Sequence, residues 1–309
     1  MKLSVIIPFL NEEENINFLV SSLNDFFSSF REVEAQVVFV DDGSSDRSIE
    51  LLKQSKHYSY KAKIVKLSKN FGSLPALYAG IANAEGDLIT FIYADLQDPI
   101  ELIRQMFLKH QEGFDTIWAE RRSVKIASSR TFSKLYARLM KKYAVANFPE
   151  NGYDVVMFNQ KVKNIVSANE EPNSSIFLQI LSLGFKQTSI LYDKVDRKAG
   201  KSKWTISKKM KLVIDSFIAF SYAPIRFVTV MGLTMAFLGF LYGLFVVIYK
   251  LVGGNIQYGW SGLIVILMLG FGVTNISLGI IAEYLWRTLD VARKRGVYIV
   301  DEVIELTNN

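Results

Sequence analysis

The chain has 309 residues and a formal net charge of +6; half of its residues are hydrophobic and 21% are charged. It has no cysteine, which excludes disulfides and thiolate metal sites, and its two histidines are too few for a histidine-rich metal site. The apolar excess lies after Pro224 and the positive charge gathers just before it, which favours anionic phospholipid over nucleic acid as the partner of that charge.

Before Arg197, short β-rich runs alternate with helical patterns. Apolar runs such as Val-Ile-Ile and Val-Val-Phe-Val, each followed by a helical pattern, predict an α/β domain with a mostly parallel sheet. The expected strands cover 3–9, 36–40, 63–67, 88–93 and 115–119, and the expected helices lie near 12–27, 46–54, 73–84 and 99–111. Ligands of such sheets bind at the carboxyl ends of the strands, so the residues that follow each strand are the candidates for a site.

Two acidic loops follow the first two expected strands. The first loop begins Pro8-Phe9-Leu10-Asn11-Glu12-Glu13-Glu14-Asn15, which also fits a plain helix start with Asn11 as N-cap. The second loop reads Asp41-Asp42-Gly43-Ser44-Ser45-Asp46. Its adjacent carboxylates are suited to bind a base and ribose hydroxyls; capping of the next helix by Ser44 or Ser45 is the alternative, and both can hold together.

The loop after the fourth strand reads Tyr93-Ala94-Asp95-Leu96-Gln97-Asp98-Pro99. Asp95 and Gln97 offer two oxygen ligands, which suit Mg²⁺ or Mn²⁺ bridging a diphosphate. Such a cation would stabilise the charge that grows on a leaving nucleoside diphosphate. The alternative is a turn closed by Asp98-Pro99 before a helix.

A basic segment leads into the apolar part of the chain. Seven lysines and arginines fall between Arg197 and Lys211, and residues 205–226 predict an amphipathic juxtamembrane helix. The domain boundaries that follow are a soluble domain over 1–204, two membrane helices within 227–286 and a cytoplasmic tail over 287–309.

Two uncharged runs of 23 residues each, Phe227 to Tyr249 and Trp260 to Ala282, are long enough to cross a membrane. They predict membrane helices over 227–249 and 260–284. Basic residues precede the first and follow the second, so the positive-inside rule predicts a multi-pass protein of the inner (plasma) membrane with both termini and the soluble domain in the cytoplasm. Glycines in the second run, Gly262, Gly270, Gly272 and Gly279, are compatible with a homo-oligomer formed by close helix contact.

Five stretches in this order resemble family 2 glycosyltransferases of the GT-A (Rossmann-like) fold, in the polyisoprenyl-phosphate branch that includes dolichol-phosphate mannose synthases and bactoprenol glucosyltransferases. They are the loops after the first, second and fourth strands, Asn70-Phe71-Gly72, and Arg197-Lys198-Ala199-Gly200-Lys201-Ser202-Lys203-Trp204. The two C-terminal helices match the bactoprenol enzymes.

The resemblance implies roles for individual residues. It implies a nucleotide-sugar pocket in which Asp41 contacts the nucleobase, shaped by Pro8, Asn11, Glu12 and Asp42. Asp95 and Gln97 fall on the metal-binding positions. Arg121, Arg197 and Lys203 fall on positions that hold phosphate, and Asp154 falls near the acceptor. A membrane-facing charge cluster remains the alternative for Arg197 and Lys203.

Tyr93 departs from the family pattern, which has an aspartate at this position. A tyrosine hydroxyl can bind a sugar or ribose hydroxyl but is no carboxylate ligand, so the loss of one negative charge should weaken metal binding. The family's arginine-rich run after Arg121 is also thinned here to Arg122, Lys125 and Arg130.

The predicted activity is an inverting transfer of a hexose from a nucleotide sugar, UDP-linked by preference over GDP, to undecaprenyl phosphate. The catalytic residues predicted for it are Asp95, Arg121 and Asp154. A non-catalytic membrane scaffold that keeps the nucleotide fold is the alternative, favoured by Tyr93. A processive polysaccharide synthase is disfavoured, because the chain has no Gln-x-x-Arg-Trp signature.

Overall fold

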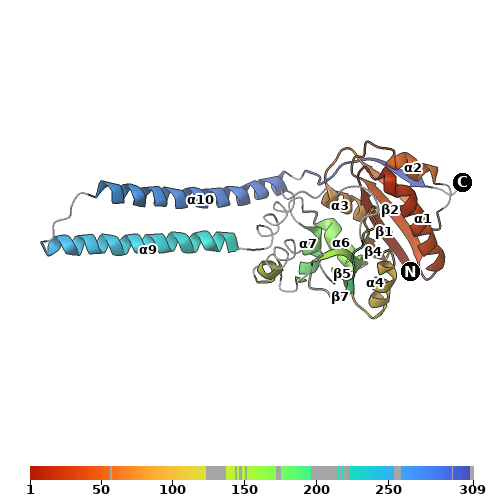
Figure 1. Cartoon of the computed structure of the whole chain (residues 1–309), viewed down its shortest axis with the longest axis horizontal. Helices are drawn as coiled ribbons and strands as arrows, with labels where there is room; N and C mark the ends of the chain where they lie inside the picture. Colours follow the sequence, from red (N-terminus) through yellow and green to blue (C-terminus); the bar gives the residue numbers. More distant parts are fainter. Residues whose placement is uncertain are drawn as a thin grey trace. The chain divides into compact units, whose positions relative to one another are not determined.

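The computed structural model describes residues 1–55, 58–122, 137–142, 145, 148–149, 152–171, 175–195, 215, 218, 221, 223–253, 259–293 and 295–306. The chain forms two compact units, one made of Met1–Asp215 with Gly296–Asn309 and the other of Ser216–Arg295. The first unit contains a sheet with helices on both faces, and the second contains two long helices (Figure 1).

Within the described residues, eight strands form one sheet in the order β7-β5-β6-β4-β1-β2-β3-β8. The strands are β1 Lys2–Phe9, β2 Glu34–Asp41, β3 Lys61–Leu67, β4 Leu88–Phe91, β5 Thr116–Arg121, β6 Tyr153–Asn159, β7 Gln187–Tyr192 and β8 Val300–Leu306. Strands β4, β1, β2 and β3 are parallel neighbours, and so are β5 and β7, whereas β6 and β8 run antiparallel to the strands beside them. This confirms the predicted α/β fold with a mostly parallel sheet.

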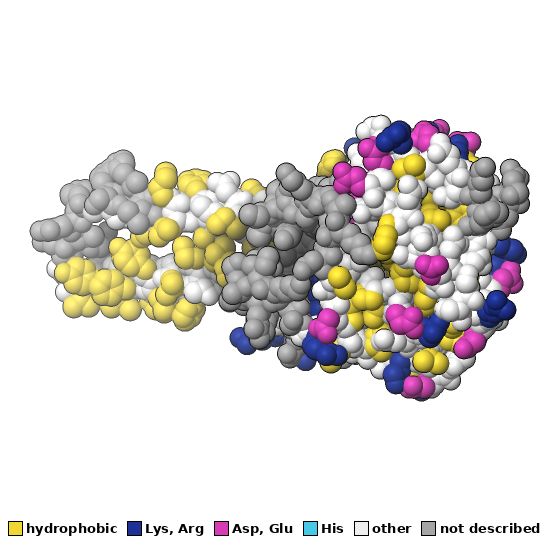
Figure 2. Space-filling view, turned by 45° about the vertical axis from the view of Figure 1, so that its right-hand side comes forward, with side chains coloured by type: hydrophobic (Ala, Val, Ile, Leu, Met, Phe, Trp, Pro, Cys, Tyr) yellow, Lys and Arg dark blue, Asp and Glu magenta, His cyan; other side chains and the backbone are white. Residues whose placement is uncertain are grey.

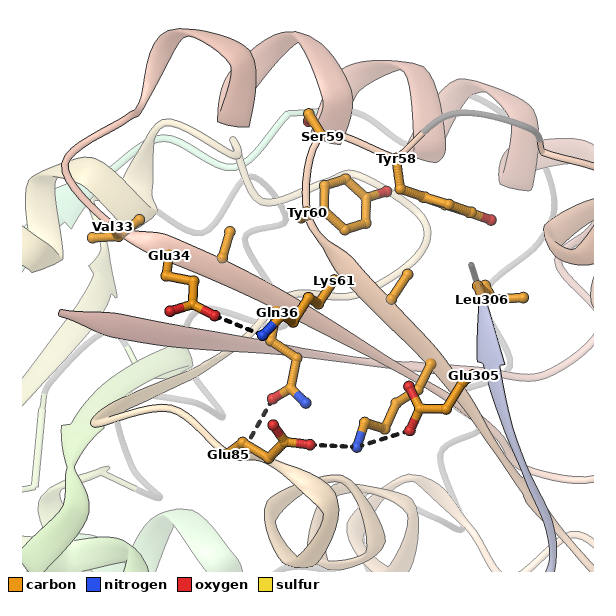
Figure 3. A pocket seen from close by; sticks show the side chains of 13 residues that line it. Val33, Glu34, Gln36, Tyr58, Ser59, Tyr60, Lys61, Glu85, Glu305 and Leu306 are labelled. Atoms are coloured by element: carbon orange, nitrogen blue, oxygen red, sulfur yellow. Dashed lines mark hydrogen bonds and ion pairs between the residues drawn. The ribbon is translucent and has the colours of Figure 1, made fainter. Parts of the chain in front are cut away.

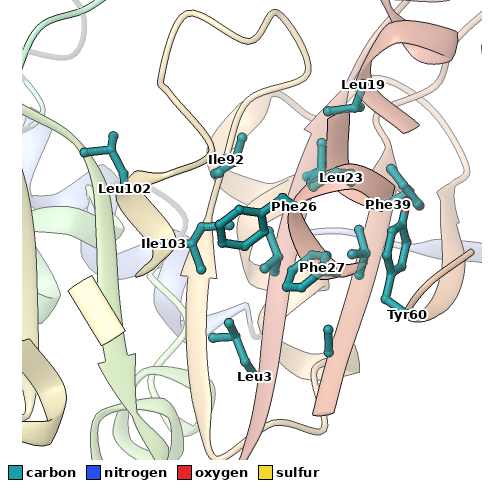
Figure 4. Close-up of a cluster of buried hydrophobic side chains, with 14 of the residues drawn as sticks. Leu3, Leu19, Leu23, Phe26, Phe27, Phe39, Tyr60, Ile92, Leu102 and Ile103 are labelled. Atoms are coloured by element: carbon teal, nitrogen blue, oxygen red, sulfur yellow. The ribbon is translucent and has the colours of Figure 1, made fainter. Parts of the chain in front are cut away.

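Helices cover the sheet because successive residues of a strand point to opposite faces. The helices of this unit are α1 Glu13–Ser29, α2 Ser48–Gln54, α3 Ser73–Asn83, α4 Leu102–Gln111, α6 Gln160–Ala168 and α7 Ile176–Ser182. On one face of β1, Leu3 and its alternate neighbours join a buried cluster with Phe26 of α1 and Ile103 of α4 (Figure 4). On the other face, α3 packs so closely that a Cβ on Gly80 would lie 2.2 Å from Cγ2 of Ile6.

The five predicted strands and four predicted helices are all present, with ends shifted by a few residues. The strands β6, β7 and β8 were not predicted. Residues 287–309 were predicted as a tail, but α10 continues to Ala292 and residues 300–306 pair antiparallel with β3. An ion pair of 2.7 Å between Lys66 Nζ and Asp301 Oδ2 joins the two strands. The alternation of polar and apolar residues in β8 is short, so this strand could not be predicted from the sequence.

The second unit consists of α9, Ala223–Leu251, and α10, Trp260–Ala292, which pack along each other. Both predicted membrane segments lie inside these helices. Both helices are long and apolar enough to span a membrane, and no part of their most apolar 18-residue stretches is buried inside the protein. Figure 2 shows apolar side chains along the helices, whereas charges of both signs cover the sheet domain. Unburied apolar surface of this extent indicates membrane association rather than the core of a soluble protein. The predicted juxtamembrane helix over 205–226 lies outside the described residues, except for a few positions and the start of α9.

Candidate active site

The loops after β1 and β2 begin side by side, because these strands are parallel and Phe9 is in register with Asp41. Asn11 has a φ of 50°, a left-handed conformation that asparagine tolerates better than most residues. Its side-chain oxygen accepts a hydrogen bond from the Ser45 amide at 2.8 Å, and its own amide donates to Ser44 Oγ at 2.9 Å. Asn11 therefore joins the two loops.

The start of α1 is also held by the neighbouring loop. Glu12 is the N-cap of α1 and makes no side-chain capping bond, so the alternative in which Asn11 caps this helix is wrong. The amides of Glu12 and Glu13 instead donate to Ser48 Oγ at 2.9 Å and Asp46 Oδ2 at 3.0 Å. The helix α2 has Arg47 as N-cap, without a side-chain cap, so capping by Ser44 or Ser45 is wrong too.

Asp41 is fully buried at the end of β2. Its Oδ1 accepts a hydrogen bond from the Ser44 amide at 2.9 Å, whereas its Oδ2 has no hydrogen-bond partner among the described residues. Burial raises the pKa of Asp41, against the hydrogen bonds from Ser44. A buried acceptor without a donor is costly unless a ligand supplies one. Asp41 therefore retains an unused acceptor at the edge where ligands bind in such sheets.

Asp42 points to a different partner, the loop 69–72. Its Oδ1 accepts from the Phe71 amide at 2.7 Å, and both of its oxygens lie within 3.1 Å of the Gly72 amide nitrogen. Gly43 has a φ of +79°, and a Cβ there would lie 2.7 Å from the backbone of Lys69 and Asn70. The two aspartates therefore have different roles. Asp41 retains an acceptor without a partner among the described residues, whereas Asp42 and Gly43 contact the loop 69–72.

The loop after β4 carries the two predicted metal ligands. Leu96 has a φ of 51°, and the Gln97 amide donates to Asp95 Oδ1 at 3.3 Å, so the two ligand candidates share one tight turn. The Gln97 carbonyl accepts from the Val195 amide at 2.9 Å, which connects this turn to the segment after β7. The described residues contain no group of three or more His, Cys, Asp or Glu side chains arranged to hold a metal.

A cluster of charged side chains lies beside this turn. Arg121, at the end of β5, makes a two-point contact with Asp154 of β6, with its Nε 2.6 Å from Asp154 Oδ2 and its Nη2 bonded to Oδ1. Lys194 Nζ lies 2.8 Å from Asp154 Oδ2 and 3.6 Å from Asp98 Oδ1. The hydroxyl of Tyr192 donates to Asp98 Oδ1 at 2.6 Å and lies 3.2 Å from Asp154 Oδ2.

Asp98 and Tyr192 of this cluster are buried, and Arg121, Asp154 and Lys194 are half-buried. The charges balance as two carboxylates and two cations. Burial alone would raise the pKa of Asp154, but Arg121 and Lys194 more than offset it and leave that pKa lowered. Burial raises the pKa of Asp98 against the attraction of Lys194. Burial works against the charge of Arg121, yet Asp154 raises the pKa of its guanidinium further, so Arg121 stays a cation.

Tyr93 is half-buried next to these acids. Burial, and then the charges of Asp154 and Asp98, raise the pKa of Tyr93 far above its ordinary value. The phenol therefore stays protonated near neutral pH. It is able to donate a hydrogen bond, but it cannot supply the negative charge of the aspartate that it replaces.

Comparisons with known proteins bear on all of these loops. The sequence model for glycosyl transferase family 2 matches residues 4–157. The uncharacterized glycosyltransferase YkcC of Bacillus subtilis is 35% identical over 99% of this chain and 95% of its own length. The bactoprenol glucosyl transferase of Shigella phage SfV is 32% identical over 97% of this chain and 98% of its own length. This chain belongs to glycosyl transferase family 2.

Among solved structures, glucosyl-3-phosphoglycerate synthase from Mycobacterium tuberculosis, in complex with Mn²⁺, UDP-glucose and phosphoglyceric acid, is 17% identical with a TM-score of 0.47, covering 70% of this chain and 77% of that one. That likeness is too distant to assign residues or ligands here. The full-length relatives make the chain a glycosyltransferase, as the five stretches predicted.

A cavity of about 690 Å³ lies away from these loops, at the start of β2 and β3 and the end of β8, the opposite edge of the sheet (Figure 3). Its charged residues are already paired: Lys61 with Glu34 at 2.8 Å, and Lys63 with Glu85 at 2.8 Å and Glu305 at 3.3 Å. A second cavity of about 560 Å³ is lined by Leu96 and Asp98 and lies beside the predicted metal loop.

The remaining predicted site residues lie in different parts of the chain. Pro8 is buried near the end of β1, in register with Val40, and its role in shaping the nucleotide pocket stays a prediction. Glu12 accepts a hydrogen bond from Asn15 Nδ2 at 2.7 Å at the start of α1. Arg197 and Lys203 lie outside the described residues.

Three members of the charged cluster were not predicted as site residues: Asp98, Tyr192 and Lys194. Asp98 was interpreted as the end of a turn before Pro99. Tyr192 is the last residue of β7 and Lys194 follows it, and this strand was not predicted. An acid after β4, and a tyrosine and a lysine at the carboxyl end of β7, were the available signal, since functional side chains of this fold class lie there.

Proposed function

We propose that this glycosyltransferase transfers a hexose, from a UDP-sugar by preference, to a polyisoprenyl phosphate at the cytoplasmic face of the membrane, with undecaprenyl phosphate as the acceptor. One observation carries the proposal: the similarity to bactoprenol glucosyl transferases extends over 97% of the chain, through the sheet domain and both apolar helices. A soluble acceptor would give these helices no purpose in the reaction. The product would supply lipid-linked sugar for cell-surface glycan modification.

The donor's nucleotide is proposed to bind at the carboxyl ends of β1 and β2. The unpartnered Oδ2 of Asp41 would accept a hydrogen bond from an N–H of the base, which removes the cost of leaving this oxygen unpaired. Asn11 and Asp42 hold the loops around this position through the contacts described above, and Glu12 and Tyr93 lie on the adjoining turns.

Asp95 and Gln97 are proposed to hold Mg²⁺ or Mn²⁺. Two oxygen ligands from one turn fit these cations, because Mg²⁺ is usually bound through one or two carboxylates, with waters and substrate phosphates completing its shell. When bound, the ion would neutralise charge on the leaving diphosphate. The chain's own part is to keep both oxygens on a turn fastened by the hydrogen bond from Val195 to Gln97.

Arg121 is proposed to bind a phosphate with the N–H groups that Asp154 does not use. Its Nη1 has no partner among the described residues, while Asp154 fixes the plane of the guanidinium. A planar guanidinium held in this way is suited to bind phosphate oxygens. Asp154 acts in this proposal by positioning Arg121, since its lowered pKa makes it a poor proton carrier near neutral pH. Arg197 and Lys203 would add phosphate contacts from the basic segment.

The proposed reaction is a single inverting displacement. An oxygen of the acceptor phosphate attacks the anomeric carbon, the bond from that carbon to the donor diphosphate breaks, and the nucleoside diphosphate leaves with the bonding electrons. A phosphate monoester has its second pKa near 6, so the attacking oxygen is already ionised and no strong general base is needed.

The test is transfer by the detergent-purified full chain with undecaprenyl phosphate, Mn²⁺ or Mg²⁺, and labelled UDP- or GDP-sugars. We expect label in the organic phase, lost in Asp95→Ala. A native protein that leaves all label in water with every donor would refute the proposal. It would favour the scaffold alternative, which rests on Tyr93. In that case Tyr93→Asp, which restores the missing charge, measures whether the loss of activity lies at the metal loop.

A further inference from the structure

Resting on the proposed function, we propose that Tyr192 and Lys194 are positioning residues that hold the metal loop in place. Together with Val195 they form a segment, the 192–195 clamp, which joins the turn carrying Asp95 and Gln97 to the strand carrying Arg121.

The clamp spans a distance that strand pairing alone does not bridge. In the order β7-β5-β6-β4, the strand β7 is three positions from β4, which is roughly 14 Å at the usual spacing between strands. Nevertheless the Tyr192 hydroxyl, at the end of β7, lies 2.6 Å from Asp98 Oδ1 in the loop after β4. That loop must therefore fold across the ends of β6 and β5, and the side chains of the clamp meet it there.

Lys194 is the essential member of the clamp because its positive charge lies between two carboxylates, Asp98 and Asp154. Asp98 has a fully buried side chain, and its Oδ2 has no partner among the described residues. Lys194 Nζ is shared between Asp98 and Asp154, at 3.6 Å and 2.8 Å. Without this ammonium, the buried Asp98 and the half-buried Asp154 would face each other across one tyrosine hydroxyl, and the repulsion of these carboxylates would drive the loop away from β6.

Backbone hydrogen bonds carry this effect to the proposed metal ligands. The Arg122 amide donates to the Tyr192 carbonyl at 2.8 Å, and the Val195 amide donates to the Gln97 carbonyl at 2.9 Å. The Gln97 amide in turn donates to Asp95 Oδ1. A shift of the clamp therefore moves both the main chain of Gln97 and the side chain of Asp95.

The first test is hydrogen–deuterium exchange of the full chain in detergent, which needs neither donor nor metal. We expect Lys194→Met and Tyr192→Phe to speed exchange in peptides covering residues 93–99, at least several-fold, and Lys194→Arg to restore much of the protection. Lys61→Met is the matched control, because Lys61 is also paired with a carboxylate, Glu34 at 2.8 Å, but at the opposite edge of the sheet. Unchanged exchange over residues 93–99 in Lys194→Met would overturn the clamp.

The second test separates positioning from mere stability. Lys194→Met should weaken the affinity for Mn²⁺ with UDP, measured by calorimetry, and lower kcat, each by roughly 10- to 100-fold, as expected when a partner behind a metal ligand is lost. Faster exchange with native Mn²⁺·UDP affinity and native kcat would also overturn the proposal. A native chain that transfers no sugar would defeat the proposed function instead, while the exchange comparison would still decide the clamp.

Discussion

Asp41 satisfies only one of its two carboxylate oxygens within the described part of the protein, although it is fully buried. In Asp41→Asn the side chain can keep the acceptor for the Ser44 amide but no longer offers a charged acceptor to a base. A hydrogen bond to a charged group contributes about 1.5–3 kcal/mol, so we expect the donor KM to rise roughly 10- to 100-fold with a small change in kcat. Steady-state kinetics with varied nucleotide sugar measures this.

The stability of the same variant provides the control. Asp41→Asn removes a buried charge, so its melting temperature should be equal to or above that of the native protein. Asp42→Asn, by contrast, replaces an oxygen that accepts from the loop 69–72, and it should lower the melting temperature. If Asp41→Asn bound the donor with native KM, the assignment of this oxygen to the base would be wrong.

For individual residues, the sequence predicted which of them lie near the site better than it predicted which groups they contact. The order of motifs placed Asp95, Gln97, Arg121 and Asp154 near one edge of a sheet. It could not show that Asp154 engages Arg121, because that pairing depends on β5 and β6 lying side by side. Similarly, Asp41 and Asp42 look equivalent in sequence but face different partners, since adjacent side chains leave the end of a strand in opposite directions.

The contact between the loops after β2 and β3 requires a glycine at position 43. An alanine at position 43 would adopt a φ of +79° and place its Cβ 2.7 Å from backbone atoms, which cannot rotate away as a side chain can. We expect Gly43→Ala to destabilise the sheet domain by about 3 kcal/mol or more, at the upper end of the cost of local backbone strain. Thermal unfolding followed by tryptophan fluorescence measures the loss.

Gly152 is the matched control for this substitution. It has a φ of +75° but open space where a Cβ would lie. Gly152→Ala should therefore lower the free energy of unfolding only by the cost of a left-handed backbone conformation, about 1–2 kcal/mol. Equal losses in the two variants would mean that the contact between the loops adds nothing to backbone conformation.

At the opposite edge of the sheet, Glu85 forms ion pairs with Lys2 and Lys63 whose contribution to stability depends on pH. Hydrogen bonds from Lys2 and then Lys63 lower the pKa of Glu85 from 4.5 to about 2. Because the folded state lowers this pKa, the stabilisation is complete above about pH 4.5 and is lost as the pH falls towards 2. The Glu85 side chain is 50% exposed, so solvent screening limits the effect to about 1 kcal/mol or less.

We therefore expect Glu85→Gln to lower the melting temperature slightly at pH 7, and to converge with the native protein as the pH falls from 4.5 towards 2. The comparison is made by thermal unfolding at a series of pH values. If the difference in melting temperature between the two proteins stayed constant down to pH 2, Glu85 would stabilise the fold through packing rather than through its charge.

A long apolar run made several elements predictable: β1 and β2 contain one that is followed by a helical pattern, and each membrane helix is itself such a run. The strands that were not recognised, β6, β7 and β8, are held by neighbours distant in sequence: β6 lies between β4 and β5, and β8 joins β3 from the far end of the chain. Their short mixed sequences do not indicate a strand without those neighbours.

For the whole molecule, the two apolar helices are inserted into the chain of the sheet domain. Residues before Asp215 and after Gly296 belong to one compact unit, and β8 returns to pair with β3. A crossing by both helices keeps these two parts of the chain on one side of the membrane, as one unit requires. A single crossing would leave them on opposite sides, where β3 and β8 could not pair. If the helices cross the membrane, this fold therefore requires an even number of crossings, independently of the positive-inside rule.

This topology can be tested directly because the native chain has no cysteine. A single Val252→Cys places a thiol just after α9, at a position that is 83% exposed, and Ser167→Cys places one on the exposed surface of α6. We expect a membrane-impermeant maleimide to label Val252→Cys in intact cells and Ser167→Cys only after the membrane is permeabilised. Both variants should retain native transfer activity, which shows that labelling reports the native arrangement. The opposite pattern would place the sheet domain outside, away from cytoplasmic nucleotide sugars, and labelling of both in intact cells would show that the helices do not cross the membrane as a pair.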